Sequence, residues 1–151
     1  MNQTDIANYI GNLFPEAIIS RGPQFPTIEI PPEKLITLCR KLRDDEQLAF
    51  DYLFCLSGVD MPDHMTVVYH LESTWNGHCA VVKTHTTDRK NPVIDSVNDI
   101  WPTAGFHERE AFDLLGIRFN NHPDLRRLFL DDSWGFPLRK DYTDPARIVE
   151  R

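Results

Sequence analysis

A chain of 151 residues, 41% of them apolar, is long enough to bury the core of one globular domain. Its formal net charge of −7 excludes a general nucleic-acid binder, because phosphate contacts need clustered Lys and Arg. No apolar run approaches the ~18 residues that span a bilayer, and no secretory pattern opens the chain, so we expect a soluble protein that meets a membrane only indirectly.

The first half of the chain predicts a helix, two short strands and a second helix. Apolar residues recur at helical spacing after Thr4 and again after Pro32, and a Gly-Pro pair at 22–23 separates two alternating stretches. The expected elements are a helix that begins at Thr4 or Asp5 and ends at Pro15, strands at 17–21 and 27–30, and a helix that begins at Pro31 and Pro32.

Three further strands are predicted at 49–59, 65–71 and 79–86. The second alternates apolar and polar residues, which is typical of a sheet with one buried face. The order α-β-β-α-β-β-β predicts the α+β class: two layers, with helices packed on an antiparallel or mixed five-stranded sheet. Cys39, Cys55 and Cys79 form no CxxC pair, so we interpret them as apolar side chains in a reducing compartment.

A last helix is predicted over 103–115, with Gly116 as its stop. Helical geometry places alternate sets of residues on its two faces. One face carries Ala104, Glu108, Ala111 and Leu115, and the other carries Phe106, Arg109, Glu110 and Asp113. Arg109 and Asp113 stand four residues apart, but an exposed pair at this spacing contributes only about 0.3 kcal/mol and does not explain such a concentration of charges. Both faces mix apolar and charged groups, which indicates that the charges have a purpose beyond solvation.

Beyond residue 120 no regular period continues. We therefore divide the chain into an α+β domain at 1–120 and an extended partner-binding tail at 121–151. Long irregular stretches of this kind are generally functional or disordered. This one is too apolar for simple disorder, since it contains Trp134, Phe136, Leu138, Tyr142, Ile148 and Val149. The hypothesis that follows is that another protein covers the tail.

Three motifs follow one another in this part of the chain: HEREAFDLLGIRF at 107–119, HPDLRRL at 122–128 and PLRKDY at 137–142. In this order they resemble the signature of the 30 kDa subunit family of respiratory complex I, which is the C-type subunit of NADH-quinone oxidoreductase. The residues interpreted as family signature and subunit interface are Glu108, Arg109, Glu110, Asp113, Gly116, His122, Pro123, Leu125, Arg126, Arg127, Trp134, Phe136, Pro137, Leu138, Arg139, Lys140, Asp141 and Tyr142.

Three positions depart from the family pattern. Asn121 stands where glycine is usual, and we expect it to keep a left-handed backbone there. Phe106 replaces a common tryptophan, and Phe136 falls at the place of a common histidine. These changes affect the detailed contacts of the loop rather than the resemblance as a whole.

The resemblance implies an enzyme only as part of a complex. The chain itself would be a non-catalytic subunit of the hydrophilic arm, with no catalytic, cofactor-binding or metal residues. The assembled proton-translocating complex would hold NADH, FMN, iron-sulfur clusters and quinone. Its partners would be the large quinone-site subunit (49 kDa or D type) and neighbouring arm subunits, at the cytoplasmic face of the inner cell membrane. An equivalent subunit of a membrane-bound [NiFe] hydrogenase or of an F420- or ferredoxin-linked complex is a related alternative.

The charged residues suggest a way in which the tail is fastened. We expect Glu108 to be at least partly buried and held by an arginine of the returning tail, with Arg126, Arg127 or Arg139 as candidates, because a buried carboxylate needs a partner. A tail pinned in this way would present Trp134, Phe136 and Leu138 to a neighbouring protein.

Two readings from other classes stay open. A free-standing hydrolase would use the acidic cluster of Glu108, Glu110 and Asp113 with a histidine, and a regulatory binding module would carry a mobile tail. His107 and Glu108 begin an HExxH zinc motif, but Ala111 stands where the second histidine is needed. No metal site is expected from the histidines, which are scattered along the chain at His64, His70, His78, His85, His107 and His122.

Overall fold

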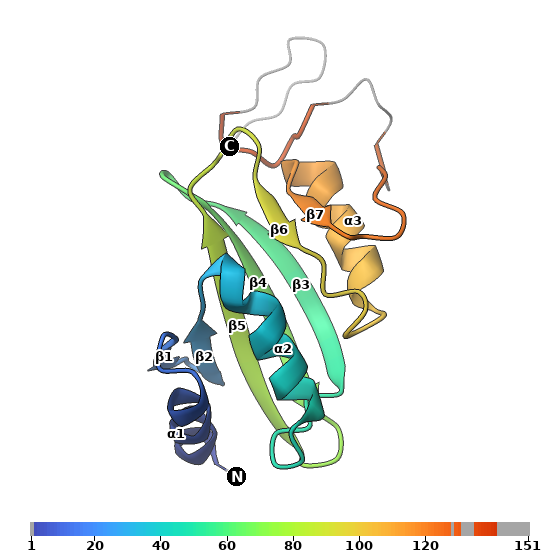
Figure 1. Ribbon diagram of the computed structural model, residues 1–151. Helices are drawn as coiled ribbons and strands as arrows, with labels where there is room; N and C mark the ends of the chain where they lie inside the picture. The colour runs from blue at the N-terminus through green and yellow to red at the C-terminus, as the bar shows by residue number, and fades with distance from the viewer. Residues whose placement is uncertain (1, 128, 131–134, 142–151) are drawn as a thin grey trace.

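The computed structural model describes residues 2–127, 129–130 and 135–141 (Figure 1). Its elements are α1 Gln3–Leu13, β1 Ile18–Arg21, β2 Pro26–Glu29, the 3-10 turn η1 Pro32–Lys34, α2 Leu35–Asp44, β3 Tyr52–Asp60, β4 Met65–Ser73, β5 His78–Thr86, β6 Val93–Asp95, α3 Ala104–Leu115 and β7 Arg118–Asn120. The predicted α+β class, with helices on a five-stranded sheet, is confirmed.

The main sheet is mixed, with the strand order β1-β2-β5-β4-β3. Neighbouring strands are antiparallel except for β2 and β5, which pair in parallel. A second, two-stranded parallel sheet joins β6 to β7. The sequence did not predict β6 and β7, because three residues are too few to show a period. This small sheet places residues 93–95 beside the strand that follows the C-terminus of helix α3 (Figure 1).

Helix α1 begins two residues earlier than expected. Asn2 is the N-cap: its side chain accepts the backbone N–H of Asp5 at 2.9 Å, and the Asp5 carboxylate accepts the N–H of Asn2 at 3.4 Å. This reciprocal capping box makes Asp5 the third helical residue rather than the cap. The prediction that Thr4 or Asp5 caps the helix was therefore wrong, although Asp5 does stabilise its start.

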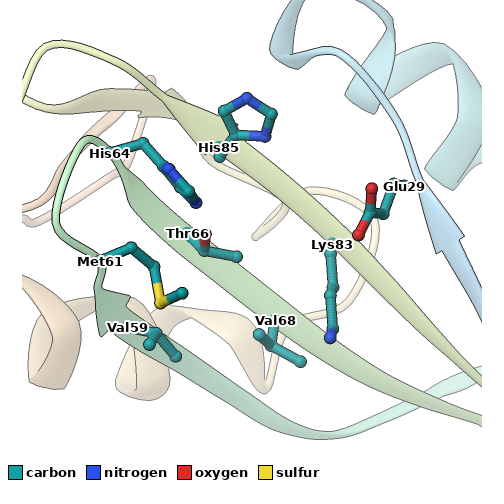
Figure 2. Close-up of a pocket in the computed structure, with 8 residues that line it drawn as sticks. All are labelled: Glu29, Val59, Met61, His64, Thr66, Val68, Lys83 and His85. Carbon is teal, nitrogen blue, oxygen red and sulfur yellow. The ribbon is translucent and has the colours of Figure 1, made fainter. Parts of the chain in front are cut away.

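Helices α2 and α3 pack on the same face of the sheet. In β4 the residues that face the helices are buried, and those between them are half-buried, as the alternating sequence predicts. Gly58 of β3 pairs with Val67 of β4 and faces Leu115 of α3. The opposite face of the sheet, called the open face below, carries Thr66, Val68 and other half-exposed side chains (Figure 2).

The cysteines divide between the two faces. Cys39 of α2 is fully buried in the core, and burial raises the pKa of its thiol far above the ordinary range. Cys55 and Cys79 are half-buried, and all three thiols are free. The interpretation as apolar core residues therefore holds fully for Cys39 and only in part for the other two. Among the described residues no helix has the length and apolar character to cross a membrane.

Gly58 offers a test of how tightly α3 is packed on β3. A Cβ at this position would lie 2.6 Å from Leu115 Cδ1 and 2.9 Å from Ile117 Cδ1. We expect Gly58→Ala to lower the free energy of unfolding by about 1–3 kcal/mol, because the buried neighbours have to shift. Gly11→Ala in α1 is the matched control: its nearest neighbour would be 3.4 Å away, so the change should be neutral or stabilising by up to about 1 kcal/mol. Equal urea midpoints for the two variants would contradict this packing.

Candidate interaction site on helix α3 and the C-terminal segment

Helix α3 ends at Gly116, where the backbone is left-handed with φ 78°. A Cβ on Gly116 would lie 2.7 Å from both the Phe136 ring and the Arg139 guanidinium. Glycine is therefore needed twice, for the turn and for the close approach of the segment 135–141. Asn121, which follows β7, is also left-handed with φ 65°, as its place in the motif predicts.

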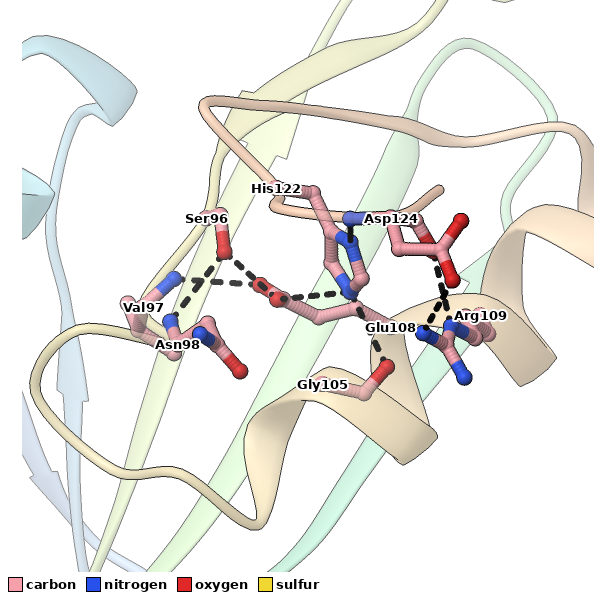
Figure 3. A network of polar contacts seen from close by, with 8 residues as sticks. All are labelled: Ser96, Val97, Asn98, Gly105, Glu108, Arg109, His122 and Asp124. Carbon is pink, nitrogen blue, oxygen red and sulfur yellow. Dashed lines mark hydrogen bonds and ion pairs between the residues drawn. The ribbon is translucent and has the colours of Figure 1, made fainter. Parts of the chain in front are cut away.

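Glu108 was expected to be at least partly buried, and it is fully buried, but no arginine of the described residues holds it (Figure 3). Ser96 Oγ donates to Glu108 Oε1 at 2.7 Å, and the N–H of Val97 donates to Oε2 at 3.1 Å. The hypothesis of an arginine partner was wrong, because the short turn that follows β6 supplies the donors instead. Burial raises the pKa of Glu108 to about 7, and these two hydrogen bonds oppose the rise.

His122 closes the other side of this network (Figure 3). Its Nδ1 accepts the N–H of Asp124 at 3.0 Å, so the ring proton is on Nε2, which donates to the carbonyl of Gly105 at 3.0 Å. Nε2 also lies 3.9 Å from Glu108 Oε1, and both side chains are almost fully buried. The hydrogen bond from His122 to Gly105 thus attaches the segment that follows β7 to the first turn of α3.

Asp113 holds the arginine that was expected at Glu108. It was assigned to the helix face opposite Glu108, where an ordinary surface pair with Arg109 was the alternative, but it is fully buried. Its carboxylate accepts from Arg127 Nε at 2.5 Å and from the N–H groups of Phe129 and Leu130 at 2.7 and 3.2 Å. Burial alone would raise the pKa of Asp113, but the three donors outweigh it and hold this pKa below its usual value. The expected link between a helix carboxylate and a tail arginine therefore exists at Asp113, five residues further along the helix.

Arg109 turns away from Asp113 toward the tail. Its Nε donates to the carbonyl of Asp124 at 2.8 Å, and its Nη2 lies 3.0 Å from the Asp124 carboxylate. Arg126 approaches the same carboxylate, with Nε 3.3 Å from Oδ2. These pairs lie at the surface, where an ion pair contributes at most about 1 kcal/mol.

The Phe136 ring lies between two arginines. The guanidinium carbons of Arg127 and Arg139 lie 5.2 and 5.0 Å from its centroid, and the ring of Phe112 lies 6.1 Å away. Arg139 Nε also donates to the carbonyl of Leu115 at 2.6 Å. Phe136 was expected to face a neighbouring protein, but these cation–π contacts use it inside the fold.

Asp60, at the end of β3, is an anchor that the sequence analysis missed. It is nearly fully buried, forms an ion pair with Arg89 and accepts the N–H of Lys140 at 2.8 Å. The N–H of Leu138 bonds to the carbonyl of Leu114 at 3.0 Å. No motif links Asp60 to Arg89 or Lys140, and an aspartate that ends a strand resembles an ordinary turn residue.

The remaining predicted residues surround these anchors. Pro137 is buried, Leu125 and Glu110 are half-buried, and Pro123, Arg126, Lys140 and Asp141 are exposed. Trp134 and Tyr142 lie outside the described residues. Among the described residues of helix α3 and the C-terminal segment, the large apolar side chains left exposed are Phe106, Phe129 and Leu138, with 53%, 63% and 46% of their surface accessible. The rings of Phe106 and Phe129 meet edge to face at 6.4 Å.

The geometry defines a class of protein: a small α+β domain whose C-terminal segment is fastened along one helix through buried carboxylates. Residues 28–147 match the family described as the respiratory-chain NADH dehydrogenase 30 Kd subunit. The chain belongs to this family, as the three motifs had indicated.

Relatives of known name agree with this assignment. The chain is 51% identical over 127 residues to the C/D-type subunit of NADH-quinone oxidoreductase from Phocaeicola vulgatus, with 81% of this chain and 24% of that protein covered. It is 49% identical over 104 residues to the C-type subunit from Chloroherpeton thalassium, with 67% of this chain and 43% of that protein covered. It therefore spans between a quarter and a half of the length of these two relatives. The C-type subunit from Moorella thermoacetica is 38% identical, with 86% and 88% covered.

A solved structure shares the fold. It is described as the membrane-bound sulfane sulfur reductase, an archaeal respiratory membrane complex. One of its chains superposes with a TM-score of 0.80 at 26% sequence identity, covering 95% of this chain and 86% of the other. The same architecture therefore occurs in a second respiratory assembly.

Glu108 should make stability depend on pH. Its folded-state pKa of about 7 exceeds its ordinary value of 4.5, so the folded protein holds this proton more tightly than the unfolded chain. The contribution is fully present below pH 4.5 and declines by up to about 3 kcal/mol as pH rises through 7. We expect Glu108→Gln to remove this decline in urea unfolding at about pH 5 and about pH 8.

The matched control is Glu110→Gln on the same helix, which should keep the wild-type difference between the two pH values. A Glu108→Gln variant with the wild-type pH profile would contradict the assignment of this titration to Glu108.

Asp113 should contribute strongly to holding the segment 127–130 on helix α3. Asp113→Asn removes the buried charge that accepts from Arg127 and from the N–H groups of Phe129 and Leu130, which should cost about 3 kcal/mol. We expect faster limited proteolysis between residues 120 and 130, measured by mass spectrometry. Asp124→Asn is the control, since its exposed pairs are worth at most about 1 kcal/mol. Equal cleavage rates in the two variants would show that Asp113 does not fasten the tail.

Proposed function

We propose that this chain is a non-catalytic peripheral-arm subunit of a proton-translocating NADH:quinone oxidoreductase, in which it scaffolds the large quinone-site subunit. The observation that carries the proposal is the C-terminal segment. Its polar anchors are turned inward, to Asp113, Asp60 and the end of α3, while Phe129 and Leu138 stay exposed. A segment held in this way is an interaction surface prepared before its partner arrives.

The energetics support an interface. Ordering a free tail on binding costs conformational entropy, and a pre-formed surface reduces that cost. Exposed aromatic side chains contribute strongly when a partner covers them. The contacting rings of Phe106 and Phe129 offer such a centre, and Leu138 adds a further exposed apolar side chain on the same C-terminal segment as Phe129. The inward anchors favour this reading over a regulatory module with a mobile tail.

The C/D-type relatives support the choice of partner. In the protein of Phocaeicola vulgatus the matched region is about a quarter of a longer polypeptide, whose name joins the letters C and D. Fusion keeps two modules at high effective concentration, which benefits modules that bind each other. We therefore infer a partner of the large, 49 kDa or D type, together with neighbouring subunits of the hydrophilic arm.

The proposal assigns the redox chemistry to other subunits. NADH, FMN, iron-sulfur clusters and quinone belong to the assembled complex, and this chain contributes no cofactor or catalytic residue. Glu108 and Asp113 are used within the fold, since each accepts hydrogen bonds from neighbouring segments. This use supports a structural role over the hydrolase reading. The chain would lie at the cytoplasmic face of the membrane, held there by its partners.

A second candidate is the equivalent subunit of a related membrane complex, such as a [NiFe] hydrogenase or an F420- or ferredoxin-linked enzyme. The superposition on a chain of the archaeal sulfane sulfur reductase supports this second candidate, because a complex named for a different activity contains a chain with the same fold. The identity of the large subunit that purifies with this chain separates the two candidates.

The interface should be tested by affinity purification of the tagged full chain from native membranes, with bound chains identified by mass spectrometry. We expect Phe129→Glu and Leu138→Glu each to reduce recovery of the large subunit by about tenfold or more, because a charge enters an apolar contact. Trp75→Glu is the matched control. Trp75 is 84% exposed and lies between β4 and β5 in the chain. The connection between these two strands is at the end of the sheet far from β7 (Figure 1).

Recovery of the same large subunit by both tail variants and the control would overturn the interface. Far-UV circular dichroism of each variant shows whether the domain itself is intact.

A further inference from the structure

The fold brings together two histidines that stand far apart in the sequence. His64 lies in the turn between β3 and β4, and His85 lies near the end of β5. Because Thr66 pairs with His85 across the two strands, the imidazoles meet on the open face, with centroids 4.8 Å apart and planes tilted by 53°. Both histidines line a depression of about 330 Å³, with Met61 and Val59 among the other lining residues. Figure 2 shows the two rings at one end of this group of side chains.

Ring nitrogens are available on both histidines. The Asp63 carboxylate lies 2.5 Å from His64 Nδ1, which leaves His64 Nε2 pointing away from Asp63. Within the described part of the chain, no residue forms a hydrogen bond to the His85 ring, and His85 is exposed, so its ring can rotate to direct a nitrogen at His64. A carboxylate on the far nitrogen is the usual support of a metal-binding imidazole, because it fixes the tautomer and makes the free nitrogen more basic.

We propose that His64 and His85 form a binding site for a divalent transition metal ion of the zinc class. Imidazoles bound to one ion through metal–nitrogen bonds of about 2.0–2.1 Å have ring centroids roughly 5 Å apart, close to the spacing found here. The described residues hold no metal-binding group of three or more His, Cys, Asp and Glu side chains. The ion therefore takes two protein ligands and completes its shell with water, for which the open depression leaves room.

The site also has a structural consequence. The turn that carries His64 begins directly after Asp60, and Arg89 follows β5 shortly after His85. An ion between the histidines therefore joins the same two segments as the Asp60–Arg89 pair, next to the place where Asp60 accepts the N–H of Lys140. Metal binding should stabilise this junction and raise the melting temperature of the domain. This inference does not depend on the proposed function, since it concerns the isolated chain.

The test is isothermal titration of the untagged full chain with zinc chloride, using protein in which Cys55 and Cys79 are replaced by serine to exclude binding at thiols. We expect one saturable site per chain, abolished by His64→Gln and by His85→Gln. Asp63→Asn should weaken binding about tenfold, as loss of a supporting carboxylate does elsewhere. Magnesium chloride should not bind, because Mg²⁺ prefers oxygen ligands.

His70→Gln is the matched control, because His70 lies on the same open face but stacks on Phe54, with ring centroids 5.6 Å apart. It should bind zinc like the parent protein and show the same increase in melting temperature. Absence of saturable binding, or binding that survives either His64→Gln or His85→Gln, would overturn the proposal.

Discussion

The buried carboxylate of Asp113 is the interaction on which the C-terminal part of the molecule depends. A charge placed fully inside a domain is costly unless donors surround it, and here all three donors come from residues 127–130. The Asp113 carboxylate on helix α3 therefore lacks these hydrogen-bond donors until residues 127–130 pack against the helix. This requirement explains how a stretch without helical or strand period takes a defined course.

The sequence predicted the regular elements because their periods are long enough to be visible. Helix α2 and strand β4 repeat their apolar positions several times, and the structure follows them closely. The short strands β6 and β7 and the bulge in β3 between Leu53 and Cys55 depend on tertiary pairing, which leaves no local signal. The start of α1 was missed because Asn2 and Asp5 act as a pair, and either residue alone resembles a cap.

The sequence predicted that a carboxylate of the last helix binds an arginine of the tail, but it did not predict which carboxylate does so. The burial of Glu108 followed from its place on the same helix face as small and apolar side chains, and a carboxylate held by a tail arginine followed from the cost of burying charge. Which carboxylate took the arginine did not follow, since the path of the tail determines it. Ser96 and Val97 reach Glu108 only because the unpredicted β6–β7 pairing brings them there. The proximity of His64 and His85 was not predicted for the same reason, because only the strand register places them together.

The single parallel pairing in the main sheet has a consequence for how the chain is made. Thr27 of β2 finds its partner Val81 only after about fifty further residues have been synthesised. Non-local contacts of this kind slow folding, because a long loop must close before they form. While the ribosome is still adding β5, the N-terminal hairpin and α1 have no sheet to join. Nascent chains should therefore remain able to bind chaperones until β5 has emerged from the ribosome. Strand β5 completes the sheet, because it pairs with β2 on one side and with β4 on the other.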